Sequence, residues 1–103
     1  MTLDQQFADD MIRLSDTAAK RGYHPRYFLQ MIETRGAVAA ARILLKGESV
    51  QSGLFRLAEL GLLQHSMENI MLNPKYVELF TTTEKRVAGA RLEALGFTPG
   101  LWE

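Results

Sequence analysis

Residues 2–22, TLDQQFADDMIRLSDTAAKRG, carry the clearest folding signal in the chain. Thr2 and Gln5 have the spacing of a capping box, in which two side chains bind amides that the first turn of a helix leaves unpaired. Two cations precede Gly22, which can adopt the left-handed conformation that ends a helix. We therefore predict a helix over residues 3–21. Its apolar residues recur every three or four positions and form one face: Leu3, Phe7, Met11, Leu14 and Ala18.

Helix signals continue through the middle of the chain. Pro25 suits the first turn of a second helix, because its φ is already helical and a first-turn position needs no amide donor. Gly36 separates that helix from a third one, expected over residues 37–46. The polar residues 47–52 indicate a loop, which is followed by a short fourth helix that ends at Gly61.

The last part of the chain is also punctuated as helices. Ser66 suits the N-cap of a fifth helix, and Asn73 with the proline after it ends that helix and opens one or two further turns. Thr81 and Glu84 repeat the capping-box spacing, so a last helix is expected from there to about Leu95. No stretch alternates apolar and polar residues as strands do. The sequence therefore predicts an all-α fold, a compact irregular bundle of five to seven short helices.

Composition and charge limit the class of protein. The chain has 47% apolar and 23% charged residues and no cysteine, which fits one globular domain over residues 1–103 without disulfides or cysteine-bound zinc. We find no signal-peptide pattern and no apolar run of membrane-spanning length, so we expect a cytoplasmic protein. The net charge is zero, but residues 1–19 carry −3 and residues 20–56 carry +5. Such segments either indicate an anionic partner or neutralise one another in the fold.

No residue pattern indicates catalysis. The two histidines are His24 and His65, and only His65 has a further ligand type, Glu68, at a spacing that shares a helix face. A metal site needs three or four converging ligands. The serines lack a nucleophile-elbow context, and the glycines form no phosphate-binding loop. We therefore expect a protein that is not an enzyme and that has neither a cofactor nor a metal site.

Two features favour association with a protein. The apolar face of the first helix has nearly heptad spacing, and Trp102 lies beyond a turn at the end of the chain, where it either folds back on the core or reaches another subunit. For every one of these side chains the alternative is packing in the core of its own chain. We expect a non-enzymatic protein-interaction or regulatory module, with a homo-oligomer as one form of it. The candidate interface residues are Phe7, Met11, Leu14 and Trp102.

Residues 20–27 suggest an alternative function. They place cations and tyrosines at the corner between the first two helices: Lys20, Arg21, Tyr23, Arg26 and Tyr27. Cations neutralise phosphates and tyrosine rings stack on bases, so this basic corner would suit a nucleic-acid-binding accessory protein. The same side chains could instead complement a helix end and half-bury against the core. A helix-turn-helix around Gly61 is not favoured, because the helix that follows offers no lysine or arginine.

Several ordered motifs resemble a known family. They are YHPRYFLQM at residues 23–31, GLFRL with ELG at residues 53–61, and LFT at residues 79–81. Together they are similar to a family of small uncharacterised bacterial all-helical domains, which occur alone or joined to larger restriction- or defence-type proteins. The resemblance covers roughly residues 23–97 and implies a shared fold but no reaction or cofactor. It leaves an Arg42–Glu59 or Arg42–Glu68 pair as an ordinary tie between helices.

Overall fold

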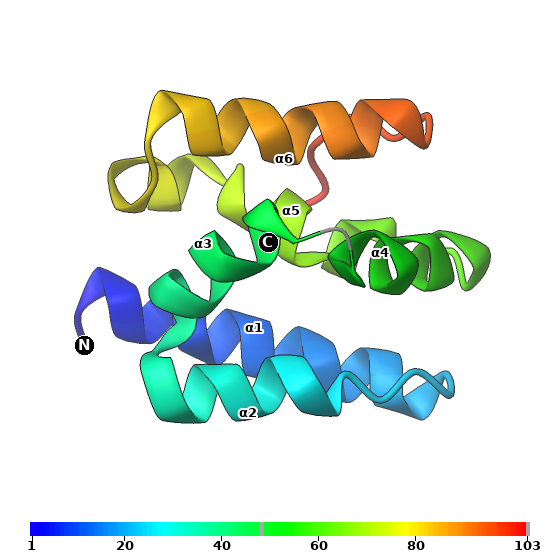
Figure 1. Cartoon of the computed structure of the whole chain (residues 1–103), viewed down its shortest axis with the longest axis horizontal. Helices are drawn as coiled ribbons and strands as arrows, with labels where there is room; N and C mark the ends of the chain where they lie inside the picture. Colours follow the sequence, from blue (N-terminus) through cyan, green and yellow to red (C-terminus); the bar gives the residue numbers. More distant parts are fainter. Residues whose placement is uncertain (48, 103) are drawn as a thin grey trace.

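The computed structural model describes residues 1–47 and 49–102, with only the backbone given for residues 49–52, and the described chain is helical without strands (Figure 1). It measures 32 × 27 × 25 Å, so the predicted all-α compact bundle is confirmed. The α-helices are α1 (Leu3–Lys20), α2 (Arg26–Arg35), α3 (Ala37–Lys46), α4 (Ser49–Glu59), α5 (Met67–Met71) and α6 (Thr82–Ala94), and the short 3-10 helices are η1 (Leu63–His65) and η2 (Pro74–Leu79).

Helix α1 begins and ends close to the predicted positions. The Gln5 amide donates to the Thr2 hydroxyl at 3.2 Å, and the Thr2 amide donates to the Gln5 side chain at 2.9 Å, which completes the capping box. Gly22 follows the helix with a φ of 94°. In the next connection Pro25 is the N-cap of α2 and not its first helical residue, and Gly36 turns the chain between α2 and α3 with a φ of 86°.

The predicted loop over residues 47–52 is largely wrong, because α4 already begins at Ser49; Glu48 lies outside the described residues. Polar composition suggested the loop, but nothing in that stretch prevents a helix. The segment has no proline, and another helical turn pairs backbone groups that a loop would leave to solvent. The remaining caps are as predicted: the Ser66 hydroxyl accepts from the Asn69 amide, and Thr81 with Glu84 forms a capping box.

Apolar side chains form two core clusters. The larger one joins α1, α2, α3, α5, η2 and, through Ala88, α6; the smaller one joins the end of α1 to α4, η1 and α6. Figure 1 shows α1 and α2 side by side, α6 on the opposite side of the molecule, and α3 and α5 between them. The two clusters meet beside the connection between α1 and α2, and this seam positions the candidate site.

Candidate functional site

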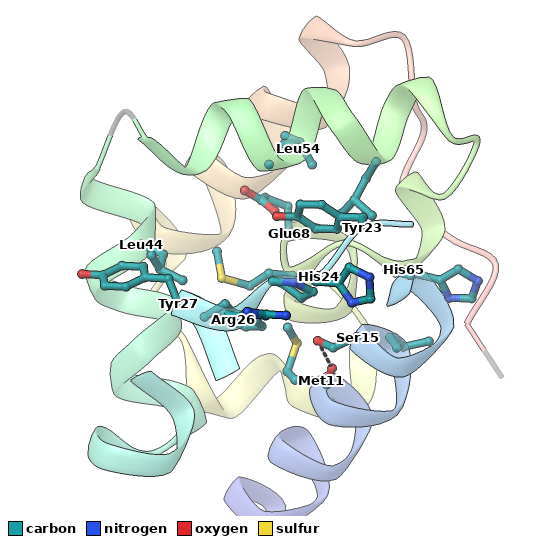
Figure 2. A pocket seen from close by; sticks show the side chains of 17 residues that line it. Met11, Ser15, Tyr23, His24, Arg26, Tyr27, Leu44, Leu54, His65 and Glu68 are labelled. Carbon is teal, nitrogen blue, oxygen red and sulfur yellow. Dashed lines mark hydrogen bonds between the residues drawn. The ribbon is translucent and has the colours of Figure 1, made fainter. Parts of the chain in front are cut away.

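An open pocket of about 430 Å³ lies at the seam between the two core clusters (Figure 2). This volume is within the range of small-ligand sites. The pocket wall belongs to α1, the connection between α1 and α2, the first turn of α2, α3, α4, η1 and α5. Most of its floor is apolar, with Met11, Leu44 and Met67 contributed by the larger cluster and Ala18, Leu54 and Leu57 by the smaller one.

The polar groups deep in the pocket are already bound within the chain. The Ser15 hydroxyl donates to the carbonyl oxygen of Met11 at 2.8 Å, which is a hydrogen bond inside its own helix. The Glu68 carboxylate, 2% exposed, forms an ion pair with the Arg91 guanidinium at 3.2 Å. Every buried side-chain nitrogen or oxygen of the described residues has a partner. These groups therefore form part of the pocket wall, and the Ser15 hydroxyl is bonded to a backbone carbonyl and not to a base of the kind that nucleophilic catalysis requires.

The ion pair of Glu68 also fixes the end of a neighbouring helix. Arg91, on α6, donates to the carbonyl oxygens of Leu45 at 2.6 Å and Gly47 at 3.3 Å, where α3 ends. Burial raises the pKa of the Glu68 carboxyl, and its own backbone amide and Arg91 lower it only in part. A charge this well enclosed is stabilised by its partners and is a structural part of the wall.

The rim of the pocket is formed by the basic corner. Tyr23, Arg26 and Tyr27 line the pocket, and Tyr27 is 68% exposed. Both histidines of the chain, His24 and His65, line it too, although they are far apart in the sequence. Figure 2 shows the side chains of His24 and Arg26 in the centre of the opening and Tyr27 at its outer edge beside Leu44. The fold thus brings together three of the five residues predicted as nucleic-acid contacts.

The other two cations of the corner lie apart from the pocket. Lys20 and Arg21 are exposed at the end of α1 and do not line it. The Arg21 guanidinium donates to the carbonyl oxygen of Leu60, beyond the end of α4, at 3.1 Å. This bond connects the end of α1 to the end of α4. Arg21 therefore has a structural role as well as a positive charge that an anionic partner could meet.

Gly53, the first residue of the GLFRL motif, lines the pocket, a place that the motif did not indicate. A Cβ atom at this position on α4 would stand 2.5 Å from the hydroxyl of Tyr23, so the ring of Tyr23 rests directly on the glycine backbone. Burial, with a smaller effect from Glu68, raises the pKa of the Tyr23 phenol. The shift favours the neutral phenol, and Tyr23 lies beside Glu68 in the wall of the pocket (Figure 2). A glycine within a helix was the available signal.

Of the four residues predicted as an interface, Phe7 and Met11 lie in this chain's own core, whereas Leu14 and Trp102 are only partly buried. Phe7 and Met11 are 0% and 2% exposed, and Phe7 packs edge-on against Tyr76 and Phe80 at 5.3 and 5.2 Å between ring centroids. Leu14 is half-buried and packs on the larger cluster. The indole N–H of Trp102 donates to the carbonyl oxygen of Asn69 at 2.7 Å. Phe7 and Met11 are therefore covered mainly by this chain's own helices, although Met11 also lines the floor of the pocket.

His65 and Glu68 both line the pocket, yet no group of three or more histidine, cysteine, aspartate or glutamate side chains in the described part of the chain could hold a metal ion. Within that same part, no helix has the length and apolar character to cross a membrane. No protein-family model, curated protein or solved structure matches this chain. The family resemblance, the domain assignment and the cytoplasmic location therefore stay predictions.

Proposed function

We propose that the protein is a non-enzymatic binding module that takes up a large apolar side chain of a protein partner in the pocket between α1 and α4. The observation that carries this proposal is the combination of an open, mostly apolar hollow with exposed Arg26 and Tyr27 on its rim. Tyrosine and arginine around a desolvated apolar pocket are the side chains that dominate binding energy at protein interfaces.

The charge of the rim favours a partner segment that carries carboxylates. The lining residues include Arg26 and two histidines, whereas the acidic lining residue, Glu68, is enclosed and paired with Arg91. Lys20 and Arg21 add positive charge at the adjacent end of α1. An acidic segment would therefore meet a complementary potential at the opening, which speeds encounter and selects the partner.

Changes at Ser15 test the pocket directly. Ser15→Phe, on α1, would fill the hollow from its floor, whereas Ser15→Ala removes the same hydroxyl and leaves the hollow open. A displayed library of random peptides should yield apolar, acidic binders on the wild type and on Ser15→Ala, and their affinity should fall about tenfold or more on Ser15→Phe. Equal binding by both variants, each shown to be folded by circular dichroism, would place the peptides elsewhere and refute the proposal.

Single-stranded nucleic acid is the second candidate, favoured by one specific observation. The Tyr27 ring is 68% exposed on the turn of α2 that also carries Arg26, so a base could stack on it while the guanidinium meets a phosphate. A labelled oligothymidylate should then bind with an affinity that falls as salt rises, and Arg26→Glu should weaken it. Arg35→Glu makes the same charge change on α2 outside the pocket and is the matched control. Equal loss in both variants would leave only general electrostatic attraction.

A further inference from the structure

Residues 97–102 return from the end of α6 to the middle of the molecule and lie on α5 (Figure 1). They are held there mainly by one side chain. The Asn69 side-chain amide donates to the carbonyl oxygen of Gly100 at 2.8 Å, and its oxygen accepts from the Gly100 amide at 3.0 Å. The indole N–H of Trp102 then donates to the Asn69 carbonyl oxygen at 2.7 Å.

Asn69 is prepared for this contact by the residues around it. It is 0% exposed, its backbone amide donates to the hydroxyl of Ser66, and its side-chain nitrogen also donates to the carbonyl oxygen of Gln64 at 3.0 Å. These bonds orient the amide so that one donor and one acceptor face the main chain of Gly100. A side-chain amide paired in this way with a peptide group recognises the backbone N–H and C=O.

The segment that Asn69 binds resembles a docked peptide more than a part of the core. Leu101 is 77% exposed and has a left-handed φ of 65°, and neither Leu101 nor Trp102 belongs to a core cluster. Leu101 and Trp102 line one side of a second hollow, which has a volume of about 280 Å³. Its other wall includes Leu14 and His65, which also line the first pocket, so the two hollows adjoin.

We infer that the surface around Asn69 is a peptide-binding site, which the chain fills with its own residues 100–102 and which the same residues of a second copy can fill in exchange. The recognised features are a main-chain N–H and C=O at the position of Gly100 and an indole N–H two residues later. The occupant is named by the structure itself, because this segment already makes all three contacts within one chain. Exchange of an identical segment between copies adds no new contact and gives a dimer.

Tethering decides how often the exchange occurs. A segment joined to its site by a short connection has an effective concentration on the order of millimolar, so a segment supplied from outside competes poorly. Trp102→Ala removes the indole contact of the tethered segment and leaves Asn69 unchanged. The full-length variant should therefore accept an external segment that the wild type excludes.

The test uses a labelled synthetic peptide with the sequence of residues 97–102 and follows its fluorescence anisotropy. The peptide should bind full-length Trp102→Ala about tenfold or more tighter than it binds the wild type. A second peptide, with proline at the position of Gly100, lacks the N–H that donates to Asn69 and cannot adopt the φ of 154° found there, so it should bind Trp102→Ala about tenfold or more weaker than the first peptide. Because this change is in the peptide, it cannot unfold the protein.

Two results would overturn the inference. One is equal affinity of the two peptides for Trp102→Ala, and the other is no binding of the first peptide to that variant while circular dichroism shows it folded. The inference is independent of the proposed function, since Ser15→Phe fills the other pocket and should leave peptide binding to Trp102→Ala unchanged. At high protein concentration, light scattering should detect a dimer of the wild type and a smaller fraction of it for Trp102→Ala.

Discussion

Arg91 and Glu68 form an ion pair at 3.2 Å with side chains only 10% and 2% exposed. The pair joins α6 to α5, and through the carbonyl oxygens at the end of α3 it also holds a third helix. It lies under the candidate pocket, because Glu68 lines the wall there. The shape of the pocket therefore depends on the Arg91–Glu68 pair, although both side chains are almost fully buried.

Removing Arg91 should destabilise the fold more than any surface change. Arg91→Ala leaves the Glu68 carboxylate buried without its counter-ion and leaves the carbonyl oxygens of Leu45 and Gly47 without this donor, so we expect a loss of about 3–5 kcal/mol in the free energy of unfolding. Urea denaturation at neutral pH measures it. Arg86→Ala changes an exposed arginine of the same helix and should stay within about 0.5 kcal/mol of the wild type.

The pH dependence of that variant has a definite sign. The pKa of Glu68 is already raised by burial, and losing Arg91 raises it further, so the folded variant binds a proton more readily than the unfolded chain. Its stability should therefore increase, relative to the wild type, as the pH falls from neutral toward the usual carboxyl range. A difference between Arg91→Ala and wild type that is constant from pH 7 to about pH 5 would contradict the buried-charge explanation.

Glu84 should show the opposite pH dependence. Burial alone would raise the pKa of its carboxyl, but the Thr81 amide and the Arg42 guanidinium at 2.9 Å outweigh burial and hold the pKa below its usual value. The stability from these contacts is present above the unfolded pKa of about 4.5 and is lost as the pH falls through the lower folded value. Glu84→Gln should therefore cost less than about 1 kcal/mol at pH 7 and nothing at pH 2, as measured by thermal unfolding. If Glu84→Gln destabilised the protein by the same amount at pH 2 as at pH 7, the negative charge of Glu84 would not be the source of the stability.

Much of the helical framework could be predicted from local signals. The capping box at Thr2, the cap at Ser66 and the positive φ of Gly22 are decided by residues a few positions apart, and the structure confirms each of them. Phe7 and Met11 show the limit of the same reasoning. Their spacing predicts an apolar face, but an amphipathic pattern does not say whether the covering surface belongs to the same chain or to another.

The candidate site could be predicted only in part, because it depends on which helices meet. The basic corner was visible as a cluster in the sequence, whereas its union with His65, Gly53 and Glu68 requires the packing of α4 and α5 against α1. Charge pairing has the same limit. The sequence left a pair of Arg42 with Glu59 or Glu68 open, whereas the structure pairs Arg42 with Glu84, Glu59 with Arg56 and Glu68 with Arg91. Which charged side chains pair depends on which helices pack together, and the order of residues in the sequence does not show that packing.

Replacing Leu101 with glycine should leave the free energy of unfolding unchanged or raise it slightly. Its φ of 65° lies in the left-handed region, which costs a residue with a Cβ about 1–2 kcal/mol, and its side chain is 77% exposed and loses little by removal. Part of this gain is offset by the greater freedom of glycine in the unfolded chain, so Leu101→Gly should be neutral or stabilising by less than about 1 kcal/mol. Leu101→Ala keeps the Cβ and should bring no gain. A Leu101→Gly variant less stable than Leu101→Ala in urea would refute the strain argument.

The contact between Tyr23 and Gly53 gives the sharpest test of the pocket wall. Gly53→Ala places a methyl group 2.5 Å from the Tyr23 hydroxyl, so the ring must move away from α4 and open the wall. Tyr23→Phe removes the clashing oxygen, and the next nearest ring atom lies 3.6 Å from the new Cβ, an ordinary contact distance. In the Tyr23→Phe background, Gly53→Ala should therefore stabilise α4 by up to about 1 kcal/mol through helix propensity, whereas in the wild type it should be neutral or destabilising. Urea unfolding of the four proteins measures the coupling. Independent, additive effects would mean that Tyr23 does not rest on Gly53 in solution.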